Sequence, residues 1–283
     1  MPTQEATAKN SKFEMVLHSA MELPGIKINR ESFLRKELSR YFEDKVIEKA
    51  IETNPAQAGI SVKNLEQIAK ACINYETAKV TAISAVTGIP GGLAMAAFIP
   101  ADIAQFFGHI VRVLQKLAYL YGWQEIFHCD KEGLDDETSV QLTLFIGVMF
   151  GVNAANAVIA KIAKSMAIQA EKTLARKALT QGAIYPIVKK IAKLIGIRMT
   201  RGIFAKSVGK IIPLLGAGVS GVITFVGFRP MAKQLQRYLA TLPMANVDLY
   251  KKPHDNDGNN DIIDIDFSDI VIEDINDFGE TDE

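Results

Sequence analysis

The residues that most often perform metal or nucleophilic chemistry are few in this chain and widely spaced. It has four histidines and two cysteines, which are His18, His109, His128, His254, Cys72 and Cys129. Metal sites usually gather three or four ligands at short, recurring spacings. No histidine has such a partner, and His128-Cys129-Asp130 is too local to hold a metal alone. We therefore expect no metal site and no cofactor. Two cysteines are also too few for a disulfide scaffold, which favours a reducing compartment.

Other catalytic patterns are missing as well. Gly88-Ile89-Pro90-Gly91-Gly92 is rich in glycine, but it lacks the Lys-Ser or Lys-Thr pair of a phosphate-binding loop. The Gly-x-Ser-x-Gly motif of serine hydrolases does not occur. Asp102 and His109 would lie about 10 Å apart along one helix, which is too far for a catalytic dyad. We expect Asp102 to cap a helix, and His109 to be buried or to lie in a helix interface. No catalytic residue is predicted.

Charge is distributed very unevenly, although the 32 basic and 32 acidic residues cancel. Residues 161–210 contain 12 basic residues and a single acidic one, Glu171. Residues 247–283 contain 13 acidic residues and only two basic ones, Lys251 and Lys252. A solvated face without a partner is the default for any run of charged residues, but an imbalance as large as 12 to 1 favours an interaction surface. These two blocks are therefore the candidates for binding.

The basic block begins with an amphipathic helix predicted over residues 154–179. At about 100° per residue, Lys161, Lys164, Lys172 and Arg176 share one arc, opposite a face of Ala, Ile, Met and Leu. The positive charge continues with Lys189, Lys190, Lys193, Arg198 and Arg201. We predict that these residues bind an anionic lipid surface or an acidic partner.

Three partners could use this basic surface. Anionic lipid headgroups attract each surface Lys or Arg by about 1 kcal/mol. Nucleic acid would use the same charge, but its binders usually add aromatic residues or a known fold. Only Tyr185 and Phe204 are present here, so no nucleic acid is expected. The third partner is the acidic tail of the chain itself.

The acidic tail, residues 246–283, joins a polar linker to an acidic and apolar segment. Asp, Asn and Gly dominate residues 255–261, after which Ile, Val and Phe alternate loosely with acids as far as Phe278. Such segments are often disordered until they bind. We expect this tail to pair as a strand with a partner, or to fold back and compete with anionic ligands for the basic surface. A purely solubilising tail is the alternative.

Three stretches lack any charge: residues 80–101, 139–160 and 211–228. A bilayer core of about 30 Å needs about 20 helical residues, so each stretch approaches the length of a membrane span. The segment from Gly88 to Gly92 interrupts the first and predicts a helical hairpin, in which one helix ends near Gly88. Pro100 starts the second helix, which runs to about Tyr121 and is closed by Gly122. Gly216, Gly218 and Gly221 would let helices approach closely, in a bilayer or in a tight bundle. Buried core helices and membrane contact both stay open.

The spacing of apolar residues elsewhere predicts helices over residues 13–21, 31–52 and 62–85. Strand patterns are nearly absent before the tail. We predict an all-α, multi-helix bundle over residues 13–245, with apolar hairpins interrupted by glycine and proline. Residues 1–12 are expected to be a disordered leader without the apolar core of a signal peptide, and residues 246–283 a largely disordered tail.

Six short motifs occur in order between about residues 60 and 240. They start at Gly88 (Gly-Ile-Pro-Gly-Gly), Ile99 (Ile-Pro-Ala-Asp), Ala118 (Ala-Tyr-Leu-Tyr-Gly-Trp), Gly151 (Gly-Val-Asn-Ala-Ala), Gly196 (Gly-Ile-Arg-Met-Thr) and Lys210 (Lys-Ile-Ile-Pro-Leu-Leu-Gly-Ala-Gly-Val-Ser-Gly). With these motifs the sequence resembles the bacterial EcsC protein family, whose founding member is encoded beside an ABC transporter. The resemblance implies a helical, membrane-proximal accessory protein with no established enzymatic activity. Val219-Ser220, where the family is richer in glycine, and the acidic tail depart from the family pattern.

We therefore expect a non-enzymatic accessory or adaptor protein at the cytoplasmic, inner face of the cell membrane. Its basic segment would contact anionic lipid or a membrane protein complex such as an ABC transporter, and its acidic tail would modulate that contact. The first alternative is an integral membrane protein with inserted apolar hairpins. The second is a soluble helical protein with an enzymatic activity that the residues do not reveal.

Overall fold

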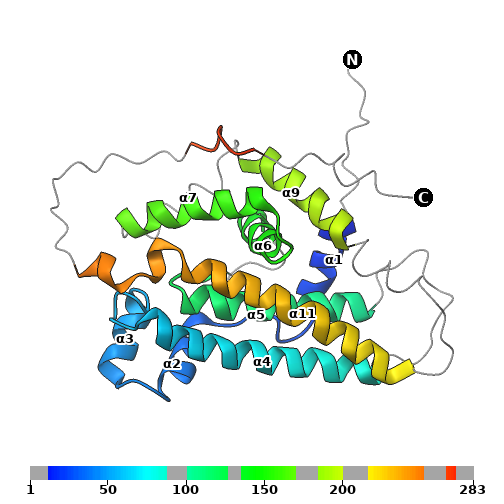
Figure 1. Ribbon diagram of the computed structural model, residues 1–283, viewed down its shortest axis with the longest axis horizontal. Coiled ribbons are helices and arrows are strands. Elements are labelled where there is room, and N and C mark those ends of the chain that lie inside the picture. Colours follow the sequence, from blue (N-terminus) through cyan, green and yellow to red (C-terminus); the bar gives the residue numbers. More distant parts are fainter. Residues whose placement is uncertain are drawn as a thin grey trace.

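The protein is a bundle of α-helices, as the sequence predicts. The computed structural model describes residues 12–87, 101–126, 135–169, 184–199, 216–251 and 266–271. Within these ranges the chain forms nine α-helices and two short 3-10 helices, and no strand (Figure 1). The α-helices are α1 (Lys12–Met21), α2 (Arg30–Leu38), α3 (Asp44–Glu52), α4 (Val62–Thr87), α5 (Ala101–Leu120), α6 (Asp136–Met149), α7 (Asn153–Gln169), α9 (Ile184–Met199) and α11 (Gly216–Ala240). The 3-10 helices are η2 (Pro243–Ala245) and η3 (Val247–Tyr250).

Two groups of helices pack against each other. In the lower half of Figure 1, α4 runs along α11, and both helices contact α5. In the upper half, α6 packs against α7 and α9, which also touch each other. The two groups meet where α6 contacts α5 and α11, and where α1 contacts both α5 and α9. The exposed sides of α7 and α9 therefore lie on the group formed by α6, α7 and α9.

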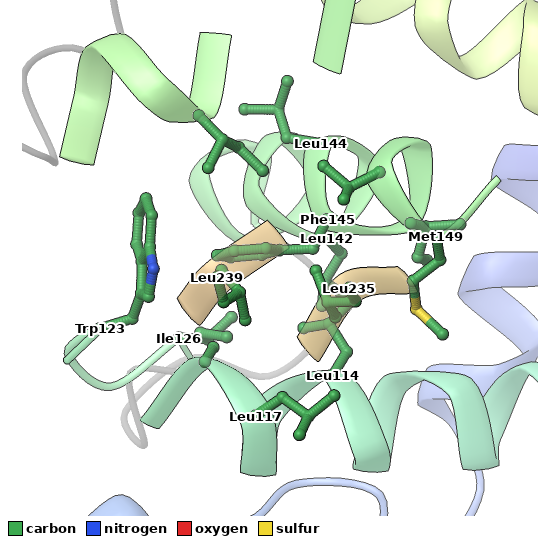
Figure 2. Packing of buried hydrophobic residues seen from close by; sticks show 14 of the residues in the cluster. Leu114, Leu117, Trp123, Ile126, Leu142, Leu144, Phe145, Met149, Leu235 and Leu239 are labelled. Carbon is green, nitrogen blue, oxygen red and sulfur yellow. The ribbon is translucent and has the colours of Figure 1, made fainter. Parts of the chain in front are cut away.

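The hydrophobic core lies between α5, α6 and α11. Figure 2 shows side chains of all three helices pointing toward one another, among them Leu114, Phe145 and Leu235, each at most 1% exposed. Trp123 closes one end of this core, with its ring 4.9 Å from that of Phe145 in an edge-to-face arrangement. Each such buried side chain contributes about 1.5–3 kcal/mol to folding, so this interface holds the two groups together.

The single helix predicted over residues 31–52 is wrong. The structure has two helices there, α2 and α3, separated by a turn in which Tyr41 and Phe42 donate N–H bonds to Leu38 O at 2.9 and 3.0 Å. In one straight helix, Ile47 would lie about 180° from Leu38, because nine residues at about 100° each end on the opposite face. Both side chains are at most 1% exposed. The turn therefore allows both to face the core.

The boundaries predicted for the α4–α5 hairpin agree with the structure. Helix α4 extends to Thr87, and α5 begins at Ala101 and ends before Gly122. Gly122 has φ +100°, and Trp123 N–H donates to Ala118 O at 3.0 Å, which is a glycine cap of the Schellman type. Gly88, Pro90, Gly91, Gly92 and Pro100 lie outside the described residues. Asp102 lies in the first turn of α5, described by its backbone alone.

The uncharged stretch at residues 139–160 is divided between two helices. Helix α6 ends at Met149 and α7 begins at Asn153, after Gly151 at φ +74°. A Cβ on Gly147 would lie 2.7 Å from Ala155 Cβ and 2.9 Å from Ile191 Cγ2, so this glycine permits α6, α7 and α9 to approach closely. The third stretch is helical from Gly216, and Gly218 and Gly221 lie in the first turns of α11. Within the described residues, no helix is both long and apolar enough to cross a bilayer.

Candidate functional site

The basic side of α7 is amphipathic in the way the sequence predicts. Ile159, Ile162 and Ala163 are at most 1% exposed, whereas Lys164 is exposed and Lys161 lies at the edge of the buried face. Alternation of buried and exposed positions at helical spacing places the apolar face against the core and the lysines at the surface. The prediction is confirmed as far as the described residues of α7 extend.

Helix α9 presents a second group of lysines. Lys189, Lys190 and Lys193 are exposed, while Ile191 and Leu194, next to them in the sequence, are fully buried. The ammonium group of Lys189 lies 4.8 Å from the centre of the Tyr185 ring, which is itself 52% exposed. We call Lys161, Lys164, Lys189, Lys190 and Lys193 the α7–α9 lysines, because the two helices that carry them pack against each other.

Four other predicted binding residues have no described side chain. Lys172, Arg176 and Arg201 lie outside the described residues, and Arg198 lies in the last turn of α9 with its backbone alone described. Neither α7 nor α9 contains an Asp or Glu. The α7–α9 lysines therefore have no acidic neighbour on their own helices.

A piece of the acidic tail contacts Lys161. The Lys161 ammonium donates a hydrogen bond to Asp266 O at 2.5 Å and forms an ion pair with the Asp269 carboxylate. Phe267, between these two residues, is 2% exposed and belongs to the hydrophobic core. We call residues 266–271 the docked segment. In Figure 1 it lies at the same edge of the molecule as α7 and α9.

The docked segment is folded as a compact turn. Ser268 donates from its N–H to Asp266 Oδ1 at 2.8 Å and from its hydroxyl to Asp266 Oδ2 at 3.0 Å. These two hydrogen bonds, with a smaller effect of the Lys161 charge, lower the pKa of Asp266. Ile270 N–H donates to Phe267 O at 3.2 Å, which closes the turn.

Burial of Phe267 holds the docked segment more strongly than the ion pair does. Lys161 and Asp269 have side chains that are 30% and 69% exposed. An ion pair at this exposure contributes little, because water and salt screen it. A buried Phe contributes about 1.5–3 kcal/mol. The ring of Phe267 therefore anchors the docked segment to the bundle. Lys161 adds a preference for an acidic residue near that ring.

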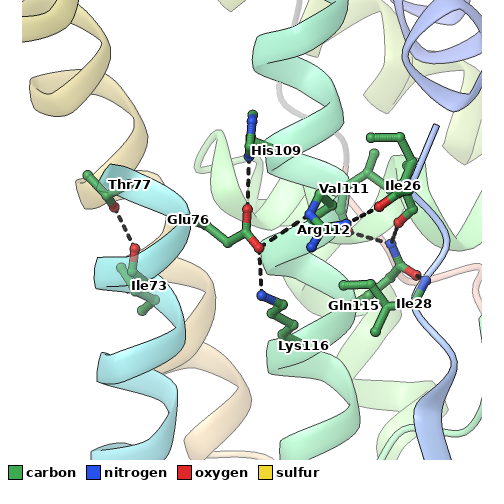
Figure 3. A network of polar contacts seen from close by, with 11 residues as sticks. Ile26, Ile28, Ile73, Glu76, Thr77, His109, Val111, Arg112, Gln115 and Lys116 are labelled. Carbon is green, nitrogen blue, oxygen red and sulfur yellow. Dashed lines mark hydrogen bonds and ion pairs between the residues drawn. The ribbon is translucent and has the colours of Figure 1, made fainter. Parts of the chain in front are cut away.

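A buried cluster of charged residues joins α4 to α5, and the sequence reasoning missed it (Figure 3). Glu76 on α4 has a fully buried side chain. It accepts a bond from Lys116 Nζ at 2.5 Å and one from Arg112 Nε at 3.3 Å, and its other oxygen lies 2.8 Å from His109 Nδ1. We call these four residues the Glu76 cluster. The prediction that His109 lies in a helix interface is confirmed, with Glu76 as its carboxylate neighbour.

The cluster keeps Glu76 ionised despite its burial. Burial acts to raise the pKa of the Glu76 carboxyl, but the hydrogen bonds of His109 and Lys116 and the charges of Lys116 and Arg112 outweigh it and lower the pKa to about 2. Three basic side chains on one face of α5 thus share one acid on α4. Their spacing of three and four residues along α5, which places them on one face, is the signal that could have indicated a shared acidic partner.

The polar contacts continue from α5 to the segment between α1 and α2. Arg112 also donates to Gly25 O. Gln115 donates to Ile26 O at 2.8 Å and accepts from Ile28 N–H at 2.8 Å, so that one buried amide satisfies both backbone groups (Figure 3). The contacts of Arg112 and Gln115 hold the segment between α1 and α2 against α5.

Arg30 forms a second buried polar centre. Arg30 is the first residue of α2. Its side chain donates to backbone oxygens at the end of α3 and after α5, which are those of Ala50, Ile51, Thr53 and Trp123 at 2.7–3.3 Å. Burial lowers the pKa of Arg30, and the nearby Glu125 carboxylate partly counters this effect. Since the last carbonyls of a helix lack partners within it, Arg30 serves as a cap for α3.

The described residues bring no catalytic group together. No group of three or more His, Cys, Asp or Glu within them is placed to hold a metal ion. Cys72 is buried, and burial raises the pKa of its thiol to about 12, so that little of the nucleophilic thiolate forms at neutral pH. Glu76 and His109 lie within hydrogen-bond distance of each other, and Glu76 also accepts bonds from Arg112 and Lys116.

Comparison of the chain with models of known protein families gives no match. The curated proteins and the solved structures likewise contain no protein that matches it. The resemblance to the EcsC family therefore stays a prediction from the sequence motifs.

Proposed function

We propose that this protein is a non-enzymatic, membrane-proximal accessory protein that contacts anionic lipid headgroups through the α7–α9 lysines. The observation that carries the proposal is the exposure of four of these lysines on two adjacent helices that contain no acidic residue. Headgroups attract each such lysine by about 1 kcal/mol, so the set supports a moderate, salt-sensitive affinity. The amphipathic character of α7 supports contact along one side of the bundle.

The acidic tail competes with the headgroups in this proposal. Lys161 is already bound to the Asp266 carbonyl and the Asp269 carboxylate, and a phosphate would need the same ammonium group. Occupation of Lys161 by the tail would lower the affinity for headgroups until the tail is displaced, while the other four α7–α9 lysines still support binding. The EcsC resemblance supports a place at the inner face of the cell membrane, beside a membrane complex such as an ABC transporter.

Charge reversal on α9 tests the proposal. The full-length chain and a variant with Lys189→Glu, Lys190→Glu and Lys193→Glu are floated with vesicles of phosphatidylcholine and phosphatidylserine. Removal of three headgroup contacts should weaken binding by about 3 kcal/mol, or about 100-fold. The matched control replaces three exposed lysines of α3 and α4, namely Lys45, Lys63 and Lys70, by Glu. Equal losses in both variants would show that net charge, and not this surface, governs binding.

A further inference from the structure

The docked segment is a short peptide motif that is folded and bound, although it is far in sequence from its binding surface. Its turn is held by the bonds of Ser268 to Asp266 and of Ile270 to Phe267, all within residues 266–270. A segment with its own turn needs little further ordering when it binds, which favours recognition of the motif as a unit.

The contacts of the docked segment are directional. Phe267 is buried at 2% exposure, and Ile270 packs partly against the core, whereas Val271 is 84% exposed. Lys161 contacts the docked segment at two points, because it donates to the main-chain oxygen of Asp266 and to the carboxylate of Asp269. The surface thus selects one aromatic side chain and an acid two residues after it.

The described contacts of the docked segment are made with its own residues, with Lys161 and with the hydrophobic core. Phe267 and Ile270 supply the contacts with the core, whereas Asp266 and Asp269 supply those with Lys161. The same motif on a separate chain would therefore meet the same groups. Tethering only raises the local concentration of the tail, to the order of millimolar for a short linker.

We propose that the surface around Lys161 is a docking site for a partner protein that carries an acidic motif of the type Asp-Phe-x-Asp-Ile, with the chain's own tail as its resident occupant. The tail then keeps the site closed to weak ligands, and a partner with a better motif displaces it. This proposal does not depend on lipid binding, because Phe267 and Lys161 define the site without the α9 lysines.

The test uses a labelled peptide with the sequence of residues 264–273 and full-length protein. Wild-type protein should bind the peptide weakly, since its own tail occupies the site. The Phe267→Ala variant, with its tail weakened, should bind the peptide at least about tenfold more tightly. An Asp269→Lys variant weakens the tail without changing a buried residue, and it should show a smaller gain in the same direction.

Two lysines on α7 provide the matched comparison. In the Phe267→Ala background, Lys161→Glu should weaken peptide binding by about tenfold or more, because it removes both bonds to the motif. Lys164→Glu makes the same change of charge at an exposed position three residues later, and it should stay within about threefold of its parent. A peptide with Phe replaced by Ala should not bind, whereas replacement of Val at position 271 should have little effect.

Several outcomes would overturn the proposal. Equal peptide affinity of the wild-type, Phe267→Ala and Asp269→Lys proteins would show that the tail does not occupy a peptide site. Equal losses from Lys161→Glu and Lys164→Glu would show attraction by charge without recognition. Binding of anionic vesicles by the Phe267→Ala variant without binding of the peptide would leave a lipid surface alone, so this proposal can fail while the lipid proposal stands.

Discussion

Lys161 on α7 forms an ion pair with Asp269, a residue 108 positions later in the chain. The pair joins the most basic part of the sequence to the most acidic part, and Phe267 beside it is buried in the core cluster. The basic block at residues 161–210 and the acidic block at residues 247–283 therefore meet in a specific contact in the folded protein. This contact is the basis of the proposed docking site and of the competition between the tail and headgroups, since it shows which lysine the tail already uses.

Release of the tail should increase binding to anionic vesicles. Phe267→Ser removes the buried anchor and frees Lys161, so we expect vesicle affinity to rise by about fivefold, the value of one lysine near a headgroup surface. Co-sedimentation with phosphatidylserine vesicles measures it. Val271→Ser is the control, because Val271 is 84% exposed and should leave affinity unchanged. Unchanged affinity of the Phe267→Ser protein would refute competition by the tail.

The Glu76 cluster should be the most sensitive polar site for stability. Glu76→Gln leaves three basic side chains in a buried interface without their carboxylate, and we expect a loss of about 3–5 kcal/mol in the free energy of unfolding. Urea denaturation followed by circular dichroism measures this loss. Glu66→Gln, at an exposed position of the same helix, should change stability by at most about 0.5 kcal/mol. Similar losses in the two variants would mean that the cluster is not stabilising.

Acid should remove the same contribution in the wild-type protein. The pKa of Glu76 is lowered from 4.5 to about 2, so the folded state binds this proton less readily than the unfolded state. The stabilisation is complete above pH 4.5 and is lost as the pH falls toward about 2, for a total of about 3 kcal/mol. Denaturation at a series of pH values should show a smaller acid dependence in Glu76→Gln than in wild type. Parallel pH curves would contradict the assignment.

Two glycines should respond in opposite directions to alanine. Gly147→Ala places a Cβ 2.7 Å from Ala155 Cβ and should cost about 1–3 kcal/mol through overpacking of α6 against α7. Gly227 lies inside α11, and a Cβ there would have no atom within 4 Å, so Gly227→Ala should stabilise by about 0.5–1 kcal/mol. Thermal unfolding compares the two proteins. A stabilised Gly147→Ala variant would contradict the close approach of these helices.

Much of the helical architecture was predictable from local patterns. The end of α5 before Gly122 follows from glycine capping, and the amphipathic face of α7 follows from helical spacing. Both are properties of short segments. The break between α2 and α3 was not predictable in this way. Leu38 and Ile47 each fit a helical pattern, and only the requirement that both face the same core forces the turn between them.

The pairing of polar side chains between helices could not be predicted from the sequence either. In the sequence, Glu76 is indistinguishable from the exposed polar residues of α4, because its burial depends on how α4 and α5 align. The charge blocks predict attraction between tail and bundle, but they do not indicate which lysine pairs with which acid. Phe267 decides this, because burial of its ring places Asp269 beside Lys161.

Flotation of the full-length wild-type protein with vesicles tests the central claim most directly. Neutral phosphatidylcholine vesicles are compared with vesicles containing phosphatidylserine, at about 0.1 M and about 1 M salt, where the Debye length falls from about 10 Å to about 3 Å. The α7–α9 lysines predict flotation with the anionic vesicles at low salt and its loss at high salt. Flotation that resists high salt, or no flotation with either vesicle, would contradict contact through these lysines.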